Sequence, residues 1–137
     1  MIHLFAAAAL AIHGLIHLIG FVVPWGIAQV EGFPYRTSAL AGAVTLGDAG
    51  TRMVGVAWLV LAVGFVVAGV ATWRRVAWAA PLTAVLAVGS IVVCTLGLPE
   101  AVFGIVVNVA ILAALGWVAV TRGSTVRVPG SPAGAGE

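Results

Sequence analysis

The chain has 137 residues, of which 63% are hydrophobic and only 7% are charged, and six arginines against four acidic residues give a formal net charge of +2. A soluble globular domain carries about 25% charged residues, so this composition excludes an ordinary soluble domain and indicates an integral membrane protein. The arginines are scattered along the chain rather than gathered in one basic segment, so nucleic acid is not expected as a partner.

The predicted transmembrane segments are the stretches without Asp, Glu, Lys or Arg, which are 1–30, 53–73, 76–99 and 101–121. A helix that rises about 1.5 Å per residue needs roughly 20 residues to cross a hydrocarbon core about 30 Å thick. Isolated strands would leave backbone groups unpaired in lipid, so the spans are expected to be helices. We predict helices at about 3–23, 53–73, 77–97 and 101–121.

The expected fold class is all-α, a polytopic membrane protein with an antiparallel four-transmembrane-helix bundle, because the turns at 73–75 and 97–100 are short. The bundle is expected to occupy residues 1–122. The remainder, 123–137, is rich in Gly, Ser, Pro and Ala, which predicts a disordered tail.

The first span is predicted to be a retained helix rather than a secretory signal, because no Lys or Arg precedes its apolar stretch and two histidines follow its alanines. The connection 24–52 is the only long one between the predicted spans. Within it, residues 38–46 are apolar enough to predict a short interfacial or re-entrant piece.

The distribution of arginines predicts the orientation of the bundle. With four spans, the side that holds the N-terminus carries Arg74, Arg75, Arg122 and Arg127, and the opposite side carries Arg36 and Arg52. Loops rich in arginine stay in the cytoplasm, so we expect both termini there.

Few side chains within the predicted spans are polar, and His13, His17 and Asn108 stand out among them, while Ser90 and Cys94 of the third span lie at a similar depth. The histidines are four residues apart, so they share one helix face. His13 lies about 15 Å and His17 about 9 Å from the end of the first helix, and Asn108 lies roughly 10 Å from the start of the last, so all three belong to the outer half of the membrane. Whether they face one another depends on helix rotation, which the sequence does not fix.

Three interpretations of this group remain open. The side chains can serve only as hydrogen bonds between helices, they can form a ligand or proton site, or His13 and His17 can bind a metal ion. Two histidines supply half of a tetrahedral metal shell, and histidines one turn apart on one helix cannot ligate opposite faces of one haem. Arg52 can be an interfacial residue, a partner of Asp48, or a group at the outer mouth that holds an anion.

Three short motifs carry a family resemblance: His13-Gly14-x-x-His17-x-x-Gly20-Phe21, Arg52-x-x-Gly55-x-x-Trp58-Leu59, and Phe103-Gly104-x-x-x-Asn108. In this order they resemble a group of small bacterial four-helix integral membrane proteins of unknown function, over about residues 10–115. Members often have a lysine before the Phe-Gly pair, where this chain has Val102. The resemblance implies that His13, His17, Arg52 and Asn108 act together in a bacterial inner membrane, and it implies no activity or cofactor.

The sequence therefore favours a non-enzymatic carrier or accessory subunit that binds a small ligand, lipid or proton at His13, His17 and Asn108, with Arg52 at the mouth. The alternative is a membrane oxidoreductase, or a metal- or quinone-binding protein, that uses the histidine pair. A purely structural subunit is the third hypothesis. Besides the lipid bilayer, a homo-oligomer or a partner membrane subunit is expected, because one small bundle encloses little volume.

Overall fold

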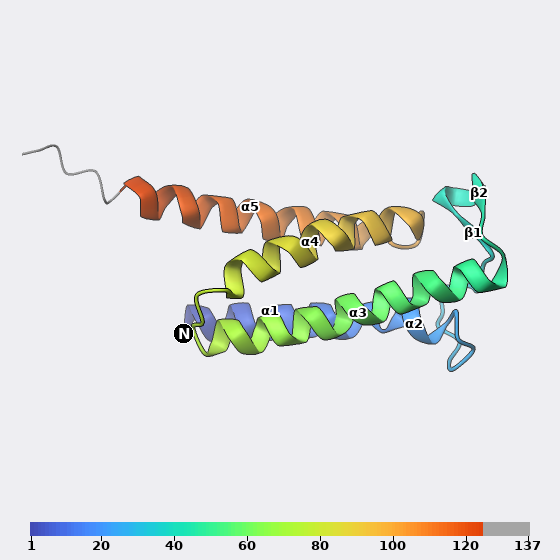
Figure 1. Cartoon of the computed structure of the whole chain (residues 1–137), viewed down its shortest axis with the longest axis horizontal. Coiled ribbons are helices and arrows are strands. Elements are labelled where there is room, and N and C mark those ends of the chain that lie inside the picture. Colours follow the sequence, from blue (N-terminus) through green and yellow to red (C-terminus); the bar gives the residue numbers. More distant parts are fainter. Residues whose placement is uncertain (125–137) are drawn as a thin grey trace, which may run out of the picture.

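Four long helical segments make up most of the computed structural model, which describes residues 1–124 (Figure 1). Helices α1 (Ile2–His17) and α2 (Ile19–Val22) follow one another and form the first segment. The others are α3 (Gly47–Trp73), α4 (Ala79–Leu96) and α5 (Val102–Ser124). Consecutive segments run in opposite directions, so the predicted antiparallel four-helix fold is confirmed.

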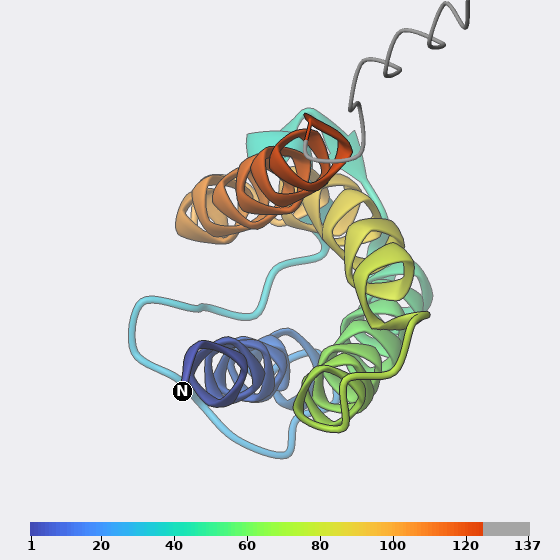
Figure 2. The ribbon, with the colours of Figure 1, turned by 90° about the vertical axis from the view of Figure 1, so that its left-hand side faces the viewer.

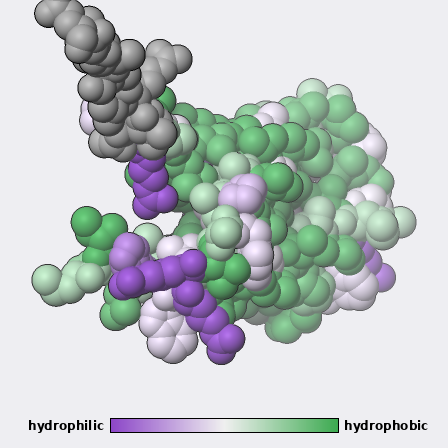
Figure 3. Space-filling view, turned by 60° about the vertical axis from the view of Figure 1, so that its left-hand side comes forward, coloured by the Kyte–Doolittle hydropathy of each residue, from purple (hydrophilic) through white to green (hydrophobic). Residues whose placement is uncertain are grey.

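All four segments are long and apolar enough to cross a membrane. Their outward surface is hydrophobic along its length, and hydrophilic residues gather toward the helix ends in the face shown in Figure 3. Among the described residues, large apolar side chains such as Phe5, Val85, Phe103 and Trp117 are more than half exposed. Such a surface is stable in lipid and not in water, so the chain is a multi-pass membrane protein.

The helices form an open crescent when they are viewed along their length (Figure 2). Helix α1 packs on α3, α3 on α4 and α4 on α5, whereas α1 and α5 occupy the two tips of the crescent. A core of Leu10, Leu61, Phe65, Ala68, Leu86 and Ala87 fills the contacts between α1, α3 and α4. The two tips therefore have a side that no helix of the described chain covers.

Small residues explain how closely α1 approaches α3. A Cβ atom placed on Gly14 would lie 2.7 Å from the carbonyl oxygen of Ala62, and one on Gly69 would lie 2.8 Å from that of Ala7. These backbones touch because glycine lacks a side chain, as is common where membrane helices associate.

Two helix ends differ from the sequence-based expectation. Helix α3 begins at Gly47 rather than near 53, so Asp48 and Arg52 lie inside its first turns. The prediction took the charge-free stretch as the helix, but a helix can continue into the headgroup region, where charges remain solvated. Helix α5 ends at Ser124, which takes in the first two residues of the predicted tail, and 125–137 lie outside the described residues.

The connection between α2 and α3 forms a small hairpin where an interfacial or re-entrant piece was predicted. Strand β1 (Ser38–Ala39) pairs antiparallel with β2 (Val44–Thr45), and a 3₁₀ turn (Leu40–Gly42) joins them. The turn is docked on the α4–α5 connection by a hydrogen bond that the Ala41 amide donates to the Leu98 carbonyl at 3.2 Å. Ala39 is buried, but residues 40–45 are exposed, so packing on the protein does not account for the apolar composition of this segment.

Candidate functional site

A network of hydrogen bonds joins the tips of the crescent to its middle. His13 Nε2 lies 3.3 Å from Asn108 Oδ1, which links α1 to α5. His17 Nε2 lies 2.7 Å from Ser90 Oγ, which links α1 to α4. The Asn108 amide nitrogen donates to Ser90 Oγ at 2.8 Å and to the Gly104 carbonyl at 2.7 Å. The structure thus brings His13, His17 and Asn108 together, and the hydroxyl of Ser90 connects them.

The side chains of the network are buried. The residues His17, Ser90 and Asn108 are at most 2% exposed, and His13 is 7% exposed. Within residues 1–124, no fully inaccessible side-chain nitrogen or oxygen lacks a hydrogen-bond partner. Satisfied polar groups of this kind hold helices in one rotation, because any other rotation would leave them unpaired in an apolar medium.

Aromatic side chains of α3 form the floor beneath the two imidazoles. The Phe65 ring lies 4.7 Å from the His13 ring and 5.2 Å from the His17 ring, and Trp58 lies 5.1 Å from His17. The indole of Trp58 also covers Gly20, where a Cβ atom would overlap the ring. Gly20 of the first sequence motif and Trp58 of the second are therefore in contact.

A cavity of about 230 Å³ lies beside the network, and we call it the α1–α5 cavity. His13, His17 and Ile16 line it from α1, and Phe103, Gly104 and Val107 line it from α5. Trp58 forms part of its floor, and Phe33 of the connection and Glu100 lie at its end. Its lining is mostly apolar, so the imidazoles are among its few polar groups.

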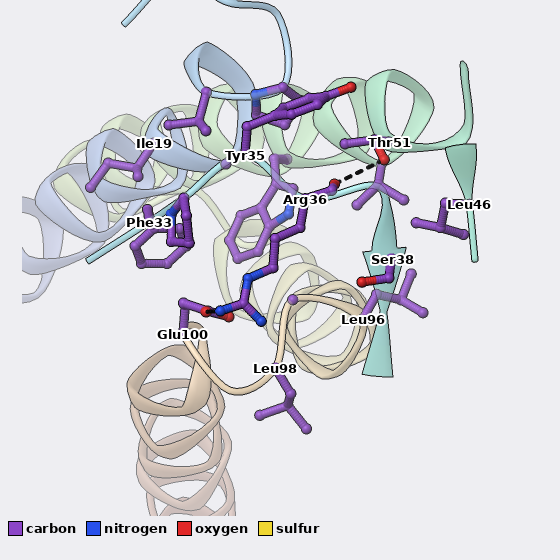
Figure 4. A pocket seen from close by; sticks show the side chains of 17 residues that line it. Ile19, Phe33, Tyr35, Arg36, Ser38, Leu46, Thr51, Leu96, Leu98 and Glu100 are labelled. Carbon is purple, nitrogen blue, oxygen red and sulfur yellow. Dashed lines mark hydrogen bonds and ion pairs between the residues drawn. The ribbon is translucent and has the colours of Figure 1, made fainter. Parts of the chain in front are cut away.

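The connection between α2 and α3 covers the end of the bundle above this cavity. Phe33 packs against the cluster of Trp58, Cys94 and Ala101. Nearby, the Arg36 guanidinium points to Glu100 at the α4–α5 turn, at 2.7 Å (Figure 4). The Arg36 carbonyl also accepts the Thr51 hydroxyl at 3.1 Å. Phe33 and Glu100 line both the α1–α5 cavity and a smaller one of about 90 Å³ directly under the connection.

Arg52 is not part of the network. Its guanidinium carbon lies 6.0 Å from the centre of the Trp25 ring, and Arg52 lines a separate, open cavity of about 670 Å³. In the described part of the chain no ion pair joins it to Asp48, whose carboxylate instead accepts the Tyr35 hydroxyl at 2.5 Å. That hydrogen bond raises the pKa of Tyr35 above its usual value, because it stabilises the protonated phenol.

The histidine pair is poorly arranged to share a metal ion. His17 Nδ1 is 2.8 Å from the His13 carbonyl and its Nε2 is bonded to Ser90, so both of its nitrogens are engaged. Among residues 1–124, no group of three or more His, Cys, Asp or Glu side chains is placed to hold a metal. A metal ion at His17 would have to displace one of these two hydrogen bonds.

Comparisons with known proteins add no further constraint. A scan against protein-family models found no match, and neither did searches of the curated proteins and the solved structures. The site therefore has to be interpreted from its own geometry.

Sequence reasoning missed the residues that connect the site. Ser90 is the hub of the network, yet a serine in an apolar helix gave no sign of this beyond its depth in the membrane. Phe65 was not distinguishable from other apolar residues, and Trp58 was singled out only as part of the second motif. The seven-residue interval between them places both on one face of α3.

Proposed function

We propose that this protein is a non-enzymatic carrier or ligand-binding subunit that takes a small apolar molecule from the bilayer into the α1–α5 cavity. The observation that carries the proposal is the position of that cavity. It has mostly apolar walls, it lies between two helices that do not pack closely on one another, and its two histidines belong to a network between helices. Ligand sites commonly combine an apolar pocket with a few polar groups that fix orientation.

The size of the cavity limits the ligand. A cavity of roughly 150 Å³ in a protein core binds benzene, and the α1–α5 cavity is about 230 Å³. It therefore suits a substituted six-membered ring, and because α1 and α5 do not pack closely on one another, a longer tail would extend between them into lipid.

The orientation and setting complete the proposal. We place both termini in the cytoplasm and the protein in a bacterial inner membrane, following the arginine distribution and the resemblance to small bacterial four-helix proteins. The network then lies in the outer half of the membrane. The exposed apolar faces of α1 and α5 are open to lipid or to a further subunit. Arg52 takes no part in this function, because it faces a different cavity.

Binding of hexylbenzene to the purified protein in mild detergent tests the proposal. Ile16 and Leu15 are neighbours on α1 and both are 56% exposed, but only Ile16 lines the cavity. We expect saturable binding to the wild type, strong loss of binding in Ile16→Trp, and unchanged binding in Leu15→Trp. Absence of saturable binding to the wild type, or equal effects of the two substitutions, would overturn the proposal.

A further inference from the structure

The hydrogen bonds of the network can be assigned a direction, one donor at a time. His17 Nδ1 faces the His13 carbonyl, which only accepts, so Nδ1 carries the proton. In a neutral imidazole the other nitrogen is then an acceptor, so Nε2 of His17 accepts the Ser90 hydroxyl. Both imidazoles are neutral, because a buried positive charge without a partner is costly. Glu100, the acidic residue that lines the same cavity, is already paired with Arg36.

The remaining directions follow from Ser90. Because its single hydroxyl proton points to His17, the Asn108 group that faces it has to be the amide NH₂, whose two protons go to Ser90 and to the Gly104 carbonyl. The other amide atom, Oδ1, is an acceptor, so His13 Nε2 carries a proton and donates it. His13 Nδ1 is then left with a lone pair and no proton.

That lone pair has no partner within residues 1–124. The one side-chain hydrogen bond of His13 uses Nε2, and no unpaired side-chain nitrogen in this part of the chain is fully inaccessible. An unpaired Nδ1 is therefore not fully inaccessible, and because His13 lines the α1–α5 cavity, we place Nδ1 at the surface of that cavity. The cavity thus presents a hydrogen-bond acceptor, Nδ1 of His13. The position of the His13 proton follows from the hydrogen bonds among His17, Ser90, Asn108 and Gly104.

We propose that the ligand of the α1–α5 cavity carries a hydroxyl group and donates its proton to Nδ1 of His13. This inference rests on the proposed function and names its ligand class, which is a hydroxylated ring such as an alkylphenol or a quinol. A molecule with only acceptor oxygens, such as a quinone or an ether, lacks the proton that Nδ1 requires. If Nδ1 of His13 carried the proton, Nε2 could no longer donate to Asn108 and that hydrogen bond would be lost. The preference for a hydroxylated ligand therefore depends on the hydrogen bonds that join α1, α4 and α5.

The test compares 4-hexylphenol with 4-hexylanisole, in which a methyl group replaces the hydroxyl proton. The measured quantity is the ratio of the two affinities in each protein, so differences in detergent partitioning cancel between variants. Once the difference in detergent partitioning is corrected for, we expect the wild type to bind the phenol about three- to tenfold more tightly than the anisole. This factor is the net contribution of one hydrogen bond. His13→Phe should lose this preference. His17→Phe keeps His13 and leaves the Asn108 amide bonded to the Gly104 carbonyl, so it should retain the preference.

Nitrogen-15 NMR of the wild type gives a second readout that needs no substitution. Addition of 4-hexylphenol should shift the His13 Nδ1 resonance, and addition of 4-hexylanisole should not. A preference that survives in His13→Phe, or an Nδ1 resonance that does not respond to the phenol, would overturn the inference while anisole binding still supports the cavity. Failure of both probes to bind saturably would instead remove the proposed function itself.

Discussion

Helix α1 meets its two neighbours in opposite ways. Against α3 the contact is dry and close, because Gly14 and Gly69 let the backbones touch. Against α5 there is a hydrogen bond between His13 and Asn108, and next to it a cavity. The difference indicates that one face of α1 maintains the fold and the adjacent face holds the site. The two faces should therefore respond differently to substitution.

The largest effect on stability is expected on the packing face. In Gly14→Ala the new Cβ atom would lie 2.7 Å from the Ala62 carbonyl oxygen, which is backbone and cannot rotate away. We expect a loss of roughly 1–3 kcal/mol, the usual cost of overpacking, measured by unfolding in detergent. Gly116→Ala is the matched control, since nothing lies within 4 Å of its Cβ position. Equal stabilities of the two variants would contradict the close α1–α3 contact.

A smaller effect is expected where α1 reaches α5. Asn108→Leu removes the partner of His13 Nε2 and one partner of Ser90. Hydrogen bonds between membrane helices average about 0.6 kcal/mol and reach about 1.7, so we expect a loss of about 1–2 kcal/mol in the same unfolding measurement. The phenol preference should also weaken, because His13 Nδ1 is no longer held as the acceptor. An unchanged preference would show that Asn108 does not set the His13 tautomer.

Two buried hydroxyl groups of α4 allow a hydrogen bond between helices to be compared with one inside a single helix. Ser90 bonds to His17 and Asn108 of other helices as well as to Cys94 of its own helix, whereas Thr83 bonds to the Ala79 carbonyl of its own helix, at 2.8 Å. Ser90→Ala is expected to cost about 1 kcal/mol of unfolding free energy, since it leaves an imidazole and an amide unpaired. Thr83→Val should cost less, because the backbone carbonyl it releases stays within the helical ladder. Similar losses in both variants would argue against Ser90 as the hub.

The smallest stability effect is expected at the connection over the cavity. Arg36 is about half exposed, and an exposed ion pair contributes about 0–1 kcal/mol. Arg36→Gln should therefore change stability little, and it should leave the release rate of 4-hexylphenol unchanged, because the ligand leaves into the bilayer between α1 and α5. The release rate can be followed after dilution. A faster release would show that the ligand leaves past Phe33 at the end of the cavity instead.

The sequence predicted the number of spans and the shared depth of His13, His17 and Asn108, because both depend on hydropathy and helix rise alone. It did not predict that the three side chains meet, since that depends on the rotation of α1 and α5 about their axes. That rotation is set by contacts such as Gly14 on Ala62 and Gly104 on the sulfur of Cys94. Arg52 was grouped with them because of its expected place at the outer mouth and the family resemblance, and neither shows which side of a helix a residue occupies.

The 38–46 segment illustrates the same limit. Its apolar residues predicted an interfacial or re-entrant piece, but the segment is a hairpin docked on the α4–α5 turn. Composition shows that such a segment avoids water, and it does not distinguish lipid from protein as the surface that covers it. The backbone hydrogen bond of Ala41 to Leu98 shows where the hairpin is docked. Residues 40–45 remain exposed, so the interfacial position of the segment stays a prediction.

The most direct test of the account is the tautomeric state of the two histidines in the ligand-free protein, measured by nitrogen-15 NMR on selectively labelled material. The account predicts that His17 carries its proton on Nδ1 and that His13 carries its proton on Nε2, which leaves Nδ1 of His13 as an acceptor toward the cavity. A proton on His13 Nδ1 would reverse the direction of the network and contradict the account.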